Sequence, residues 1–132
     1  MACNHTVDAD TKIAIIGVQG MTSFEEIVRA VERLAADRRF RPDYGVLFDL
    51  REMHYSPFAD EAATLAKTIA QSAPLRNHPM AMVASGPQLS LAEMITSVAA
   101  RRGAVARAFR PNLGAAAIWL HQQMRMRRSQ AH

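Results

Sequence analysis

The stretch Tyr44–Arg51, YGVLFDLR, decides the fold of this chain. Val46, Leu47 and Phe48 form a continuous apolar run, which is typical of a strand that is buried on both of its faces. The run is too short for a helix and is rich in β-branched and aromatic residues. It therefore predicts the central strand of a mainly parallel sheet that helices cover on both sides.

Two charged side chains, Asp49 and Arg51, follow the apolar run, and we expect the strand to end there. In open α/β sheets, ligands bind beyond the carboxyl ends of the strands, so this pair is the first candidate for a binding site. Asp49 could anchor a partner or act as a base, or it could form an ion pair with Arg51. We favour the ion pair, because structural ion pairs also perturb the pKa of a carboxylate.

Strand and helix patterns alternate along the whole chain. A hairpin is predicted within residues 4–18, with further strands at 44–51, 79–84 and 104–109, and helices at about 23–37, 57–73, 88–102 and 113–126. The order ββαβαβαβα implies an α/β fold with a mainly parallel five-stranded sheet, an antiparallel first strand and four helices. A length of 132 residues predicts one domain, 1–132.

Several residues predict where the helices begin and end. Ser23 and Glu26 have capping-box spacing before the first helix, and Thr22 with Glu25 offers a second register. Asn112 is expected to cap the last helix. In the helix at 88–102, spacing predicts that the residues facing the core are Leu91, Met94, Ile95, Val98 and Ala99.

Composition narrows the class of protein. The single Cys3 cannot form an internal disulfide, and the N-terminus lacks the basic and apolar regions of a signal peptide. No apolar run approaches the roughly 20 residues that span a bilayer. We therefore expect a cytoplasmic protein without a membrane span.

Charge is distributed unequally along the sequence. Residues 1–66 contain 7 Lys and Arg against 11 Asp and Glu, whereas residues 67–132 contain 9 against 1. From Arg101 onward there are arginines but no acids. We favour solvated helix faces and helix C-termini as the explanation. Binding of nucleic acid or anionic lipid through these arginines is therefore the third of the functional hypotheses. Nucleic acid is not an expected partner, because no aromatic–basic interleaving supports base stacking.

Four segments carry a resemblance to a known family. They are GMTSFEEI (Gly20–Ile27), PDYGVLFDLR (Pro42–Arg51), PMAMVA (Pro79–Ala84) and the closing segment Ala108–Leu120. With the order of elements, they resemble the STAS/SpoIIAA-like superfamily, and more closely its uncharacterised bacterial STAS-like members. The resemblance covers most of the chain and implies the fold above and a regulatory or protein-interaction module.

The sequence departs from this family at one point. Antagonist-type STAS domains carry an Asp-Ser-Ser-Gly-like motif at the start of the next helix, where a serine is phosphorylated. Here Asp49-Leu50 matches the preceding strand, but residues 54–59 contain no such motif. Ser56 is the one hydroxyl near the helix start. It could accept a phosphate or cap the helix before Pro57, and we favour the cap.

The remaining candidates lie near the same edge. They complete a set of ligand- or partner-binding residues, which is Asp49, Arg51, His54, Tyr55, Ser56 and Ser85. The turn at Ser85-Gly86 could hold an anion on backbone N–H groups or be a simple turn. The five histidines lack metal-ligand spacing, and no nucleophile elbow or phosphate-binding loop is present, so no metal, cofactor or catalysis is expected.

Three functional hypotheses follow. The first is a non-enzymatic regulatory module that binds a protein partner. The second is a site for a small apolar or anionic molecule at the candidate edge. The third is binding of nucleic acid or anionic lipid by the arginine-rich last third. Self-association as a homodimer, through a helix face or an edge strand, is also expected.

Overall fold

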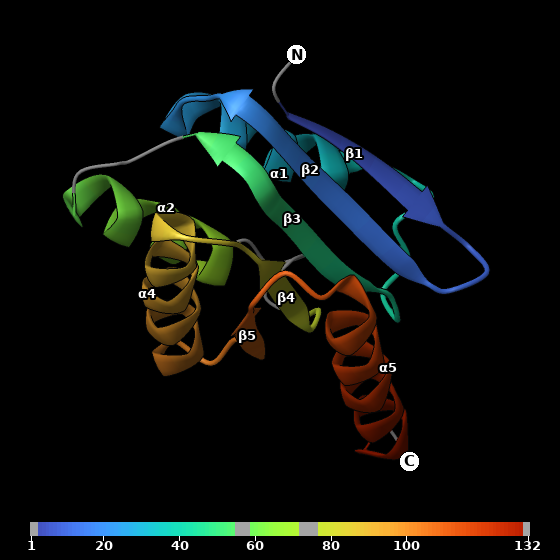
Figure 1. The fold of residues 1–132 in the computed structure, drawn as a ribbon. Coiled ribbons are helices and arrows are strands. Elements are labelled where there is room, and N and C mark those ends of the chain that lie inside the picture. Colours follow the sequence, from blue (N-terminus) through green and yellow to red (C-terminus); the bar gives the residue numbers. More distant parts are fainter. Residues whose placement is uncertain (1–2, 55–58, 72–76, 131–132) are drawn as a thin grey trace.

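The computed structural model describes residues 3–54, 59–71 and 77–130 and has the predicted α/β architecture (Figure 1). One sheet has the strand order β1-β2-β3-β4-β5; β1 is antiparallel to β2 and the other neighbours are parallel. The strands are β1 Cys3–Asp8, β2 Ile13–Met21, β3 Gly45–His54, β4 Met80–Val83 and β5 Ala106–Phe109. The helices are α1 Phe24–Ala36, α2 Ala59–Gln71, α4 Pro87–Arg101 and α5 Leu113–Gln130. The predicted order and mixed sheet are confirmed.

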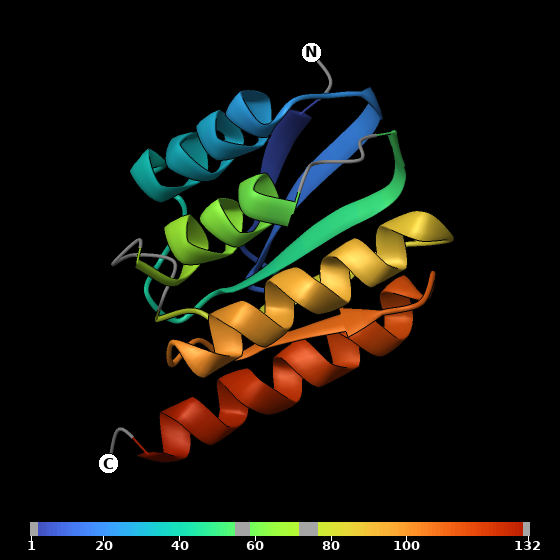
Figure 2. The ribbon, with the colours of Figure 1, turned by 90° about the vertical axis from the view of Figure 1, so that its left-hand side faces the viewer.

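The helices divide unequally between the two faces of the sheet. Figure 2 shows α1, α2 and α4 side by side on one face and α5 on the other. Each of the first three helices connects a parallel strand to its neighbour in the same direction, so crossovers of one hand place all three on one side. The larger apolar core lies under these three helices, and a smaller one lies under α5.

The central apolar run is buried as predicted. Val46 and Phe48 point into the larger core, and Leu47 points into the smaller core beneath α5. Alternation of side chains along a strand requires this division, because successive residues face opposite sides of the sheet. The first half of β3 is therefore covered by helices on both faces.

The second half of β3 differs from the prediction. The strand does not end at the predicted residue, Arg51; it continues to His54, so the predicted bounds 44–51 stop three residues short. The cause is β2, which runs three residues further than predicted and pairs Met21 with His54. Asp49 is level with Val83 at the end of β4, so β2 and β3 extend together beyond the rest of the sheet.

The helix caps largely agree with the sequence. The Ser23 hydroxyl accepts the Glu26 backbone N–H at 3.3 Å, and the Asn112 side chain accepts the Ala115 N–H at 3.0 Å. Met94 contradicts its prediction, because its side chain is 38% exposed. The buried positions of α4 are Ala92, Ile95, Thr96 and Ala99, since its buried stripe is rotated toward the smaller residues.

A close approach fixes α5 over β3 and β4. A Cβ atom on Gly45 would lie 3.2 Å from Met124 Sδ and 3.3 Å from Leu120 Cδ2, so glycine lets the helix approach the strand. At the same end, His121 Nε2 lies 2.9 Å from the carbonyl oxygen of Thr11 in the β1–β2 turn. These contacts let α5 cover Ile13 at the start of β2, and the described elements leave β1 and the rest of β2 uncovered on that side.

Candidate functional site

Part of the sheet has one face that no described element covers. We call this the bare face: the side of β1, β2 and the second half of β3 that lies beside α5 (Figure 1). Strand alternation determines which side chains point toward the bare face. Cys3 and Ile16 on the same strands point to the other side of the sheet, into the larger core. The outward residues are Asn4, Thr6, Ile15, Gln19, Asp49, Arg51 and Glu52.

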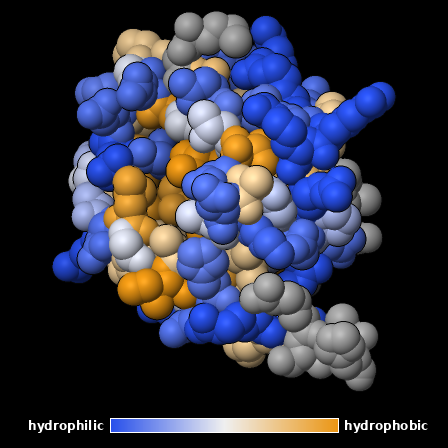
Figure 3. Space-filling view, turned by 90° about the vertical axis from the view of Figure 1, so that its right-hand side faces the viewer, coloured by the Kyte–Doolittle hydropathy of each residue, from blue (hydrophilic) through white to orange (hydrophobic). Residues whose placement is uncertain are grey.

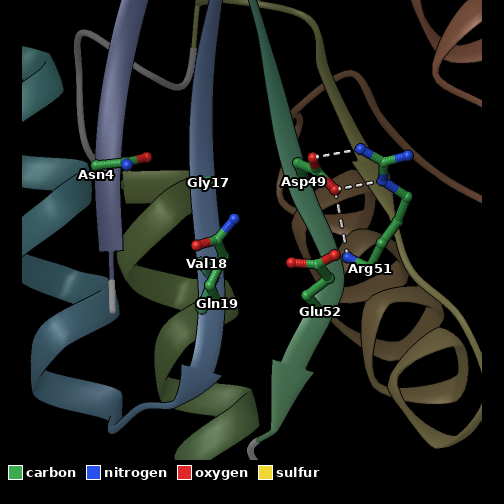
Figure 4. Close-up of a pocket in the computed structure, with 7 residues that line it drawn as sticks. All are labelled: Asn4, Gly17, Val18, Gln19, Asp49, Arg51 and Glu52. Atoms are coloured by element: carbon green, nitrogen blue, oxygen red, sulfur yellow. Dashed lines mark hydrogen bonds and ion pairs between the residues drawn. The ribbon is translucent and has the colours of Figure 1, made fainter. Parts of the chain in front are cut away.

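A shallow polar hollow of about 100 Å³ lies on the bare face (Figure 4). Gly17 and Val18 of β2 form its floor. Asn4 leans over it from β1, and Asp49 and Glu52 border it from β3. A Cβ atom on Gly17 would lie 2.9 Å from Asn4 Oδ1, so the glycine provides the space that the Asn4 side chain occupies.

A β-bulge shapes the hollow. Gly17 pairs with Asp49 and Gln19 pairs with Glu52, so the single residue Val18 faces two residues of β3. The extra residue shifts the alternation, and both Arg51 and Glu52 face outward. Bulges are rare between parallel strands and often lie next to functional sites, where they redirect side chains.

Asp49 and Arg51 form the ion pair that we favoured from the sequence. Arg51 Nε lies 2.8 Å from Asp49 Oδ1 and Nη2 lies 2.9 Å from Oδ2, and the Arg51 backbone N–H also donates to Oδ1 at 3.3 Å. The guanidinium holds the pKa of Asp49 below its usual range, although partial burial opposes this. A carboxylate with a lowered pKa is a weak general base, so the geometry favours a structural or recognition role.

Ser85 joins this pair from the neighbouring strand end. Its hydroxyl donates to the carbonyl oxygen of Arg51 at 3.3 Å, which links the loop after β4 to the bulge. The anion site considered at Ser85-Gly86 gains no support, because the N–H groups of Gln88 and Leu89 donate to the Ser85 and Gly86 carbonyls. The Ser85 side chain is therefore used within the fold.

Of the other three predicted site residues, only His54 is described, and it lies outside this arrangement. His54 lies exposed at the end of β3, opposite Met21 of β2. Tyr55 and Ser56 lie outside the described residues, so the alternatives for Ser56 stay predictions. The structure thus brings together Asp49, Arg51 and Ser85 from the predicted set.

Exposed apolar side chains lie on the side of the molecule that carries the hairpin and α5. Figure 3 views the side that carries the β1–β2 hairpin and α5, and patches of apolar surface lie there among hydrophilic side chains. Ile15 on the bare face is 37% exposed, and Ile118 on α5 is 62% exposed. Ile15 therefore adds apolar surface to the bare face, whereas Ile118 lies on the side of α5 away from the buried Ala116 and Leu120.

Three of the four described histidines make contacts within the fold. His5 pairs with Asp37 at 2.9 Å, His78 contacts the Tyr44 carbonyl at 2.6 Å, and His121 contacts the hairpin turn. Within residues 3–54, 59–71 and 77–130, no group of three or more potential metal ligands is clustered. In the same residues, no helix combines the length and apolarity that crossing a bilayer requires.

Sequence reasoning missed five lining residues, Asn4, Gly17, Val18, Gln19 and Glu52. One signal was available. Leu50 and Met53 are both buried but are three residues apart, which breaks the period of two and indicates a bulge. Asn4 and Gln19 gave no such signal, because their position depends on the antiparallel register of the hairpin.

No matching family model or curated protein identifies this site, because neither the models of protein families nor the curated proteins contain a match to this sequence. The function must therefore be argued from the bare face, its hollow and the remaining surface.

Proposed function

We propose that this chain is a non-catalytic protein-interaction module, of the regulatory kind that its STAS-like resemblance implies, and that a partner protein docks on the bare face. One observation carries the proposal: the parallel strands β2 and β3 leave one side open beside the exposed Ile15. Parallel sheets occur almost only with both faces covered. A partner would supply the missing cover.

The composition of the bare face suits a reversible partner. Ile15 provides apolar contact, and the Asp49–Arg51 pair and Asn4 provide polar contacts around it. Non-obligate interfaces are about as polar as the rest of a protein surface, which keeps the free protein in solution. The free thiol of buried Cys3 is consistent with a reducing compartment such as the cytoplasm.

Cavity size separates this proposal from small-molecule binding. Among the described residues, the polar hollow measures about 100 Å³, a surface pocket at Cys3, Glu26, Arg29 and Arg33 about 110 Å³, and an apolar cavity beneath α1, α2 and α4 about 20 Å³. Sites for drug-sized ligands usually have volumes of roughly 300 Å³ or more. A docked protein surface needs no deep pocket, so the shallow bare face supports a macromolecular partner better.

The test is a comparative pull-down from a bacterial lysate, with the wild-type chain, Ile15→Glu and Met94→Glu as baits. Ile15 and Met94 are 37% and 38% exposed, so the two variants place the same charge at equally accessible positions on opposite faces. We expect wild type and Met94→Glu to recover the same protein and Ile15→Glu to lose it, with all three baits equally folded by circular dichroism.

Two results would reject the proposal. One is recovery of no reproducible partner across growth conditions; the other is equal recovery by Ile15→Glu and wild type. Light scattering coupled to size-exclusion chromatography shows whether the partner is a second copy of this chain. A dimer that Ile15→Glu dissociates would replace the separate partner with self-association.

A further inference from the structure

The far edge of the sheet, independent of the bare face, concentrates positive charge. Beyond Glu93 the sequence contains seven arginines and no acid. None of the ion pairs found among the described residues involves an arginine of this region. The arginines whose surroundings are described are Arg101, Arg102, Arg107, Arg110, Arg125 and Arg127, and all but the half-buried Arg127 are exposed.

The fold adds aromatic rings to this charge. The Arg107 guanidinium carbon lies 5.2 Å from the centre of the Phe109 ring, and Phe109 meets Trp119 of α5 edge to face at 5.8 Å. Arg107 and Phe109 alternate onto the side of β5 that faces α5, because they pair with Ala81 and Val83 of the smaller core. The local order Arg107-Ala108-Phe109-Arg110 places one ring between two guanidinium groups, and tertiary packing adds the ring of Trp119.

The position of this cluster leaves it accessible. β5 is the last strand of the sheet, and Figure 2 shows it between α4 and α5. The rings of Phe109 and Trp119 are both partly exposed, and Arg110 follows directly after the strand. We call Arg107, Phe109, Arg110 and Trp119 the β5 cluster.

We propose that the β5 cluster binds single-stranded nucleic acid. Its arginines would contact backbone phosphates, and bases would stack on the aromatic rings and on the guanidinium plane over Phe109; sequence-tolerant proteins combine the same two contacts. Lipid binding fits less well. A membrane-surface helix exposes a continuous apolar face, whereas α5 buries Ala116, Leu120 and Met124 against the sheet, and its exposed Ile118 and Met126 are separated by the polar Gln122.

Trp119 makes the proposal directly testable, because it is the chain's single tryptophan. Titration of the wild-type protein with oligothymidylate at low salt should quench its fluorescence. Anisotropy of a labelled oligothymidylate should give the same affinity. That affinity should fall with salt, with a log–log slope of about −0.7 for each phosphate contacted.

Charge variants separate a local site from general attraction. The double variant Arg107→Gln/Arg110→Gln should weaken binding about tenfold at low salt and reduce the slope by about 1.4. Arg107→Lys/Arg110→Lys, which retains both charges, should keep the slope. As a matched control, Arg29→Gln/Arg38→Gln removes two exposed charges from the opposite end of the sheet and should change affinity little. Circular dichroism verifies that each variant is folded.

Three results would overturn the proposal. The first is no quenching and no anisotropy change at low salt. The second is equal weakening by the two glutamine double variants, which would mean that only net charge matters. The third is stronger binding to vesicles containing phosphatidylserine than to oligothymidylate, which would assign the charged edge to a membrane surface.

Discussion

At the residue scale, two of the ion pairs among the described residues join side chains only two positions apart in the sequence. Arg51 forks onto Asp49 two residues away, and Arg39 forks onto Asp37 in the same way. Sequence alone could suggest the first pair, because alternation puts residues two apart on the same face of a strand. His5, which also contacts Asp37 from 32 residues away, could not have been predicted without the fold.

His78 is the buried histidine of this structure. Its Nδ1 lies 2.6 Å from the Tyr44 carbonyl oxygen, and its ring stacks on Phe40 with 4.2 Å between centroids. Burial lowers the pKa of His78 below its ordinary value, and Arg127 acts in the same direction, while the bond to Tyr44 and the charge of Asp43 oppose it. The native state therefore favours the neutral imidazole.

This histidine predicts a pH dependence of stability. The unfolded chain has an ordinary histidine pKa of about 6.5 and binds the proton more readily, so the free energy of unfolding should fall as pH decreases below about 6.5. The loss should level off below the lowered native pKa. Urea denaturation across this range should show that His78→Asn removes most of the dependence and that the exposed His54→Asn does not. An unchanged dependence in His78→Asn would contradict this assignment.

At the scale of elements, the interior was more predictable than the surface. The run Val46–Phe48 and the caps Ser23 and Asn112 express local rules, and all are confirmed. The continuation of β3 from Glu52 to His54 was missed, because charged residues after an apolar run usually indicate the end of a strand. Here the charges belong to a strand whose second half has one open face.

The packing of α5 on β3 depends on the missing side chain of Gly45. Gly45→Ala should lower the free energy of unfolding by about 1–3 kcal/mol, because the new Cβ overpacks Met124 and Leu120. Gly114→Ala makes the same change within α5, where the nearest atom is 3.4 Å away, and should be neutral or stabilise by up to about 1 kcal/mol. Denaturant unfolding measures both; equal effects would refute the close approach.

At the scale of the whole molecule, the sheet has two dissimilar edges. The β1 side carries the open face and most of the acids, and the β5 side carries exposed arginines and the rings of Phe109 and Trp119. The charge asymmetry was visible in the sequence. The aromatic cluster beside these arginines was not visible in the sequence, because the contact between Phe109 and Trp119 requires α5 to return across the sheet. The bare face was equally hidden, since it depends on which strands α5 covers.

The bare face as a docking surface is the central claim, and site-specific photo-crosslinking in living bacteria tests it most directly. A photoreactive benzoylphenylalanine replaces Ile15 in one variant and Met94 in the other, two side chains of equal exposure on opposite faces. We predict that irradiation yields a discrete adduct with another protein chain from position 15 and none from position 94. No adduct from position 15, or equal yields from both positions, would contradict the account.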